Sequence, residues 1–156
     1  MNKNQSTKEK SCVFYVSDYH FEMISLPYIS KKLEEEKRVI IFTENNLEDT
    51  VKTLTLKINL KEDKKQKILN LDWKDNDENK FSKLEKYINE EKNIEIFIKG
   101  SNEYIEKTNK KINEYTEKNN ETKIIDCYDV GRIDEYLVDI AQKYNNVIGT
   151  AGEKSL

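Results

Sequence analysis

Short apolar runs alternate with amphipathic segments along most of this chain, and this alternation constrains the fold more than any other feature. The runs are Cys12–Val16, Val39–Phe42, Ile68–Trp73, Ile94–Ile98 and Ile124–Tyr128. They are short and rich in β-branched and aromatic residues, which is typical of strands buried on both faces of a parallel sheet. The sequence therefore predicts five such strands.

The segments between and after these runs carry apolar residues at helical spacing. These residues are Met23, Leu26, Ile29 and Leu33; Leu47, Val51, Leu54 and Ile58; Phe81, Leu84 and Ile88; Ile105, Ile112 and Tyr115; and Ile133, Tyr136, Leu137, Ile140, Ala141 and Tyr144. A repeated strand–helix order predicts an α/β fold, a single three-layer domain with a mostly parallel five-stranded sheet flanked by helices. Pro27 is expected to kink the first helix or to mark its first turn.

Length and composition limit the organisation and the partners of the chain. Its 156 residues fit one domain, which we place at residues 12–150, between a polar N-terminal arm (1–11) and a C-terminal tail (151–156). The net charge of −3 removes the global electrostatic reason to expect nucleic acid as a partner. No apolar run is long enough to cross a bilayer, and two cysteines do not make a disulfide framework. We therefore expect a cytoplasmic protein without a membrane partner.

The carboxyl ends of the predicted strands are the expected place for a ligand, because α/β sheets bind ligands there. The segments at these ends are Ser17–Glu22, Thr43–Asn46, Asp72–Asp75, Lys99–Asn102 and Tyr128–Arg132. The side chains that we expect to line a ligand site are Tyr15, Asp18, Tyr19, His20, Asp72, Tyr128, Asp129 and Arg132. Aromatic walls with a few polar groups suit a small, partly apolar ligand. Tyr15 and Tyr128 could equally be core residues with a hydrogen-bonded hydroxyl.

Motifs for specific chemistry are missing from the sequence. No glycine-rich phosphate loop of the form GxxxxGK[ST] or GxGxxG occurs. His20 is the only histidine, and Asp72–Asp77 lacks the Gly and Glu that an EF-hand loop requires. The sequence therefore predicts no resident cofactor, no metal site and no assigned catalytic residue.

The order of these features resembles the MEDS domain, the methanogen/methylotroph sensory domain of bacterial and archaeal regulators. The likeness begins with Val13–Asp18, continues with Pro27-Tyr28-Ile29 and Glu36–Phe42, and ends with Cys127-Tyr128-Asp129 and Asn146-Val147-Ile148. It implies a degenerate RecA-like fold that lacks the phosphate loop, with Ile68–Asp72 in the place of a Walker B strand. It also implies a sensory role, usually coupled to a DNA-binding or kinase-type output domain.

Three functional hypotheses follow. The first is a non-enzymatic sensory or regulatory domain that binds a small organic ligand, or a signalling partner such as a kinase or a transcription regulator, and relays the signal in trans. The second is a homodimeric adaptor without a small ligand, which predicts a contiguous exposed apolar patch, expected on the last helix with Tyr136 and Tyr144. The third is a small enzyme for a nucleotide-like or acyl substrate, with Asp18, Asp72 or Asp129 as general base and His20 as its partner.

Overall fold

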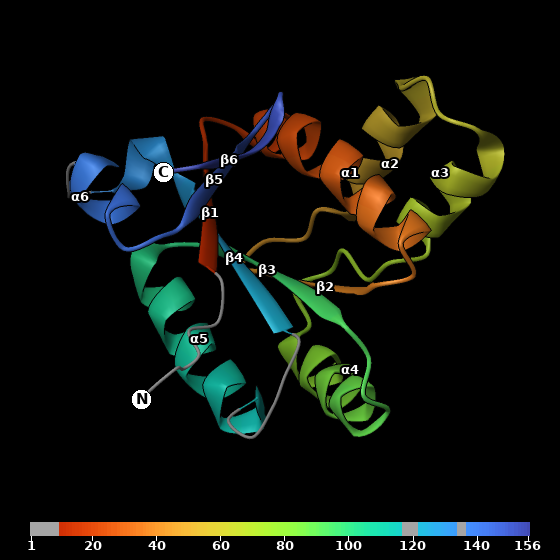
Figure 1. The fold of residues 1–156 in the computed structure, drawn as a ribbon. Helices are drawn as coiled ribbons and strands as arrows, with labels where there is room; N and C mark the ends of the chain where they lie inside the picture. The colour runs from red at the N-terminus through yellow and green to blue at the C-terminus, as the bar shows by residue number, and fades with distance from the viewer. Residues whose placement is uncertain (1–9, 117–121, 134–136) are drawn as a thin grey trace.

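The computed structural model describes residues 10–116, 122–133 and 137–156, which form a three-layer α/β domain (Figure 1). The strands are β1 (Lys10–Tyr15), β2 (Arg38–Thr43), β3 (Ile94–Gly100), β4 (Thr122–Asp129), β5 (Asn146–Gly149) and β6 (Gly152–Ser155). The helices are α1 (Asp18–Glu34), α2 (Glu48–Lys57), α3 (Glu62–Leu69), α4 (Asp77–Asn89), α5 (Asn102–Thr116) and α6 (Leu137–Ala141), with a 3-10 turn, η1 (Val130–Arg132). The α/β class and the mostly parallel sheet expected from the sequence are confirmed.

The six strands form one sheet in the order β2-β3-β4-β1-β5-β6. All neighbouring pairs are parallel except β5 and β6, which are antiparallel. From β1 the chain passes through α1 to β2 at one edge, whereas from β4 it crosses to β5 on the other side of β1. The winding direction therefore reverses at the β4–β1 pair, and ligands of α/β sheets bind beyond the strand ends at such a point.

The strand expected at Ile68–Trp73 is wrong. Ile68 belongs to helix α3, and Trp73 is buried in the loop that follows, where its indole Nε1 donates to the carbonyl of Ile68 at 2.9 Å. The backbone N–H of Leu47 donates to the carbonyl of Trp73 at 2.9 Å, which fastens this loop to the start of α2. The place of a Walker B strand, which the MEDS resemblance assigned to this run, is therefore occupied by a helix end and a loop.

Two short strands near the C-terminus, β5 and β6, bring the sheet to six strands instead of five. β6 lies in the segment that the sequence analysis set apart as a tail. Glu153 on β6 accepts hydrogen bonds from Ser11 Oγ at 2.5 Å and from Lys123 Nζ at 2.6 Å, so side chains join β6 to β1 and β4. The hairpin turn needs Gly152, whose φ of +101° is available to glycine without strain.

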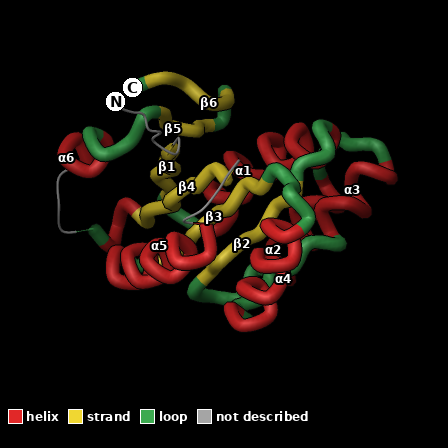
Figure 2. The backbone as a smooth tube through the Cα atoms, turned by 60° about the horizontal axis from the view of Figure 1, so that its bottom comes forward, coloured by secondary structure: helices red, strands yellow, loops and turns green. Residues whose placement is uncertain are grey.

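Helices cover both faces of the sheet, as Figures 1 and 2 show. The core under α1, α2 and α3 includes Phe21 and Phe97, whose rings meet edge to face with centroids 6.4 Å apart. The core under α4, α5 and α6 includes Phe42 and Phe81, with ring centroids 4.7 Å apart. Because side chains of a strand alternate between the two faces, neighbouring residues of β1 and β4 belong to different cores.

Helix α1 runs without interruption through Pro27. Ser17 caps its N-terminus, since the Ser17 hydroxyl accepts a hydrogen bond from the backbone N–H of His20 at 3.1 Å. Pro27 cannot donate to the carbonyl of Met23, but both residues lie on the exposed side, where water can replace the missing donor. Pro27 therefore does not mark the first turn.

Of the helical pattern expected from Ile133 to Tyr144, the described residues place Leu137–Ala141 in helix α6. Tyr144 lies beyond the end of this helix and is buried. Tyr136 of that pattern lies outside the described residues, as do residues 1–9 of the polar arm. Within the described ranges, no helix combines the length and the apolar character that crossing a bilayer requires.

Candidate functional site

A cavity of about 340 Å³ opens at the carboxyl ends of β1, β2, β3 and β4, beside the point where the winding reverses. The residues that line it are Tyr15, Asp18, Glu44, Asn45, Lys99, Gly100, Asp129 and Arg132. Each of the four strand ends contributes, because parallel strands end at the same edge of a sheet. The volume is at the lower end of the range for small-molecule sites.

Lys99 forms the floor of the cavity and is only 3% exposed. Its ammonium lies 2.9 Å from Asp18 Oδ1 and 3.0 Å from Asn45 Oδ1, and Asn45 Nδ2 donates to Asp18 Oδ2 at 3.1 Å. The three side chains thus form a closed triangle that links α1, the β2 loop and β3. The ammonium also lies 4.9 Å from the ring centre of Tyr15, within the range of a cation–π contact.

The hydroxyl of Tyr15 is available to a ligand. Tyr15 is 3% exposed and lines the cavity, and among the described residues no hydrogen-bond partner meets its hydroxyl. Burial raises the pKa of Tyr15; the nearby Asp129 and Asp18 raise this pKa further, while Arg132 lowers it. The group therefore stays protonated at neutral pH and can donate or accept a hydrogen bond.

Glu44 forms another wall and is held there by the start of α5. Its Oε1 accepts from the backbone N–H of Ser101 at 2.8 Å and lies 3.9 Å from Arg132 Nη2. Gly100 makes room for this arrangement: a Cβ at this position would lie 2.8 Å from Glu44 Oε1 and 2.7 Å from Tyr104 Cδ2. Only glycine fits here without displacing one of these side chains.

Asp129 and Arg132 approach the cavity from opposite ends of η1. Asp129 Oδ1 accepts from the backbone N–H of Gly131 at 2.9 Å, so one carboxylate oxygen caps this turn. Among the described residues, no cation lies within ion-pair distance of the Asp129 carboxylate. Arg132 is more than half exposed, and Glu44 at 3.9 Å is its one partner at that range in the described part of the chain.

The N-terminus of α1 is not arranged as a phosphate site, although it follows the first strand. Ser17 Oγ already accepts from the His20 N–H, and the Ser17 carbonyl accepts from the Phe21 N–H at 2.9 Å. The carboxylate of Asp18 stands in the first turn, where it would repel a phosphate. This arrangement agrees with the missing glycine-rich loop in the sequence.

Four of the eight predicted site residues line the cavity, namely Tyr15, Asp18, Asp129 and Arg132. Tyr19 is not among the lining residues; it is exposed on the solvent side of α1. His20 instead accepts a hydrogen bond at Nδ1 from the backbone N–H of Val16 at 2.9 Å, and therefore stabilises the turn between β1 and α1.

Asp72 and Tyr128 lie elsewhere. Asp72 lines a different, small cavity of about 80 Å³ next to β2, because the expected third strand is a loop. Tyr128 faces the opposite core, where its hydroxyl bonds to that of Tyr144, which donates to Asp126 Oδ2 at 2.6 Å. In the parallel pair β1–β4, Tyr128 lies beside Phe14, one residue before the pair formed by Tyr15 and Asp129. Tyr15 and Tyr128 therefore belong to different cores. The general base and histidine pairing expected for an enzyme with Asp72 is not assembled.

The sequence analysis did not select Lys99, Glu44 and Asn45, although it placed their segments at the strand ends. The signal that could have found Lys99 is its position: it is a lysine at the end of a mostly apolar strand. A charge in such a place is enclosed by its neighbours and needs partners. The residues that pair with it come from other strand ends, which the sequence alone does not bring into contact.

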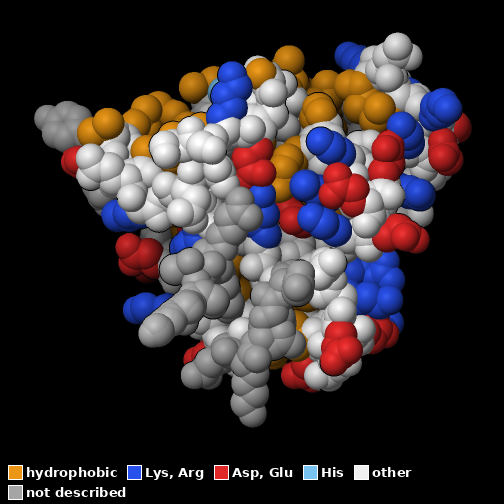
Figure 3. Space-filling view, viewed as in Figure 1, with side chains coloured by type: hydrophobic (Ala, Val, Ile, Leu, Met, Phe, Trp, Pro, Cys, Tyr) orange, Lys and Arg blue, Asp and Glu red, His pale blue; other side chains and the backbone are white. Residues whose placement is uncertain are grey.

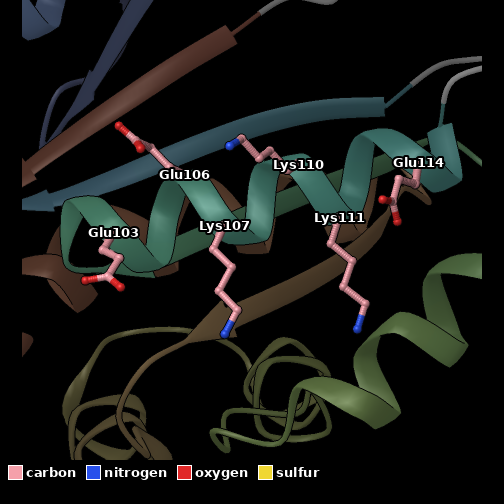
Figure 4. Close-up of a pocket in the computed structure, with 6 residues that line it drawn as sticks. All are labelled: Glu103, Glu106, Lys107, Lys110, Lys111 and Glu114. Atoms are coloured by element: carbon pink, nitrogen blue, oxygen red, sulfur yellow. The ribbon is translucent and has the colours of Figure 1, made fainter.

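A second hollow, of about 420 Å³, runs along the solvent side of α5. Figure 4 shows its lining side chains, three Glu and three Lys, which come from one helix and point in different directions without converging. It is a charged helix face in solvent. In the part of the chain that the structure describes, no three His, Cys, Asp or Glu side chains are grouped to hold a metal ion.

Comparison with protein-family models, with curated proteins and with solved structures finds no match for this chain.

Proposed function

We propose that this chain is a non-enzymatic sensory or regulatory domain that binds a small polar ligand in the cavity at the strand ends. The observation that carries the proposal is a cavity lined by enclosed polar groups: Tyr15 and Lys99 are each 3% exposed, and both line it. Small-molecule sites are typically concave and have a few convergent polar groups. The MEDS resemblance in the sequence points to the same sensory role.

The geometry suggests how binding of a ligand in the cavity could change the position of helix α1. Asp18 stands in the first turn of α1 and is tied to Lys99 on β3 and to Asn45 after β2. A ligand that takes one of these hydrogen bonds changes the restraint on the start of α1. Helix α1 also packs against α2 and α3, so a small movement at its N-terminus reaches the outer surface. The output then goes to a protein partner in trans.

Native mass spectrometry of gently purified protein tests this proposal. A bound mass of a few hundred daltons that is lost in an Arg132→Gln variant supports a ligand in the cavity. The matched control is Lys107→Gln on the exposed face of α5, which should leave the bound mass unchanged. An empty protein that also binds none of a broad set of small polar compounds contradicts the proposal.

A second function, a homodimeric adaptor, is favoured by exposed apolar residues on α1 and in the turn just before it. Val16, Tyr19 and Met23 are 69%, 49% and 56% exposed, and Pro27 continues the same helical row. Figure 3 shows hydrophobic side chains along the top of the molecule, both over α1 and over the side where α6 lies in Figure 1. A dimer that dissociates in a Met23→Lys variant, measured by light scattering over a concentration series, would support this function; a monomer at all concentrations would exclude it.

A further inference from the structure

The cavity carries charges of both signs, on its floor and around its rim. Lys99 and Asp18 neutralise each other at 2.9 Å on its floor. Arg132, Glu44 and Asp129 stand around the rim and are not neutralised in this way. Arg132 and Glu44 are 3.9 Å apart, and both are well exposed, so this pair is weak. A ligand can therefore replace the contact between Arg132 and Glu44 with little loss of stabilising interaction within the protein.

Resting on the proposed function, we infer that the ligand is a free α-amino acid, whose ammonium is held by Asp129 and Glu44 and whose carboxylate is held by Arg132. The two charged groups of an α-amino acid sit on one carbon atom, which matches a cation and a carboxylate that face each other at 3.9 Å without a close bond. A guanidinium binds a carboxylate through two parallel hydrogen bonds. The free hydroxyl of Tyr15 supplies a further donor or acceptor.

The lining disfavours ligands that carry only one kind of charge. A phosphate or a dicarboxylate would meet Arg132 but would also meet the carboxylates of Glu44 and Asp129. A diamine would contact those carboxylates, but its positive charge would then lie beside the positive charge of Arg132. Like charges at contact distance disfavour binding, so a zwitterion is the ligand with the fewest such contacts.

Calorimetric titration with the proteinogenic L-amino acids tests the inference. Asp129→Asn keeps the oxygen that caps η1 and removes only the charge, so the fold should be preserved. We expect at least one amino acid to bind, and we expect roughly tenfold weaker binding in Asp129→Asn and in Arg132→Gln, because each removes a charge-assisted contact. Glu106→Gln and Lys107→Gln on α5 are the matched controls and should bind as the wild type does.

Chemical variants of the same amino acid assign each contact. Its N-acetyl derivative lacks the ammonium and should bind weakly and equally to the wild type and to Asp129→Asn. Its amide lacks the carboxylate and should show the same insensitivity to Arg132→Gln. Derivatives that still lose affinity in these variants would overturn the assignment of ammonium to Asp129 and carboxylate to Arg132.

Two further probes separate the inference from the proposed function. If inorganic phosphate or putrescine binds and responds to the cavity variants while no amino acid binds at millimolar concentration, the inference is wrong and the proposed function stands. If the amino acids, phosphate and putrescine all fail to bind, the inference is wrong, and the proposed function then depends on native mass spectrometry alone.

Discussion

Lys99 carries an ammonium group that is enclosed at the end of strand β3, and Asp18 and Asn45 stabilise this buried charge. Enclosed charges are tolerated when they are paired, and they become costly when one partner is removed. The cavity floor is therefore both a binding surface and a structural joint between α1, β2 and β3.

Replacement of Lys99 by Met should lower the free energy of unfolding by about 2 kcal/mol, because Asp18 then loses its cation in a partly enclosed place. Asp18 is about one third exposed, which keeps the loss below that of a fully buried pair. Urea denaturation measures the change. In the double variant Lys99→Met/Asp18→Asn, the loss should be clearly smaller than the sum of the two single losses; a simple sum would show that the pair does not interact.

Glu22 is a buried carboxyl on α1 that lies close to this floor. It is fully buried, its Oε2 accepts a hydrogen bond from Thr50, and its Oε1 has no hydrogen-bond partner. Burial raises the pKa of Glu22 to about 7, although Thr50 and Lys99 act in the other direction. The folded protein therefore holds a proton that the unfolded chain releases near pH 4.5.

The resulting contribution of Glu22 to stability is fully present below about pH 4.5 and is lost as the pH rises through 7. We expect Glu22 to lower the free energy of unfolding by about 2 kcal/mol between about pH 5 and about pH 8. Glu22→Gln keeps an acceptor for Thr50 and should remove this part of the pH dependence. Urea denaturation of both proteins at the two pH values measures it, and parallel curves would contradict the account.

Gly100 is the residue that allows β3 to end beside Glu44 and Tyr104. Gly100→Ala should lower the free energy of unfolding by about 1–3 kcal/mol, because its Cβ would lie within 3 Å of both side chains. Gly149→Ala is the matched control, since a Cβ there meets nothing within 4 Å, and thermal unfolding should show little change. Equal effects of the two substitutions would mean that the close approach at Gly100 is not important.

At the scale of elements, two helices end in a conformation that suits glycine but carry glutamate. Glu36 after α1 has a φ of 62°, and Glu91 after α4 has a φ of 56°. In both places the chain closes the helix with hydrogen bonds to earlier carbonyls, as at a glycine C-cap. A left-handed conformation disfavours residues with a Cβ, so these ends are strained.

Glu36→Gly and Glu91→Gly should each raise the free energy of unfolding by about 0.5–1 kcal/mol, because glycine relieves this strain at the helix ends. The same change at Glu85, which is exposed in the middle of α4, should lower the free energy of unfolding by about 1 kcal/mol. Chemical denaturation of the three variants gives the comparison. Destabilisation by all three would contradict the role assigned to the two helix ends.

The elements that the sequence predicted well are those with a clear pattern. The apolar runs at β1, β2, β3 and β4 are long enough to be read as strands, and α1, α2, α4 and α5 show helical spacing. The run at Ile68–Trp73 was misread because a helix end followed by a docked tryptophan has the same apolar content as a strand. The strands β5 and β6 are too short, and too polar in β6, for a reliable pattern.

At the scale of the whole molecule, the sequence predicted the edge of the sheet where the cavity lies but not the set of residues that meet there. Tyr15 and Tyr128 looked equivalent, yet the strand alternation puts them on opposite faces of the sheet. Glu44 and Lys99 join Asp18 and Arg132 only because the order β2-β3-β4-β1 brings four strand ends together. Strand order and facing direction depend on tertiary packing, which buried apolar strands do not encode locally.

The central claim is that the cavity binds a small polar ligand, and amide chemical-shift mapping tests it most directly. The protein would be titrated with a mixture of L-amino acids, inorganic phosphate and putrescine, and the shifted amides would be assigned. The account predicts saturable shifts confined to the strand ends, at residues 15–18, 44–45, 99–101 and 129–132. Shifts that are absent there, or that gather on the charged face of α5, would contradict it.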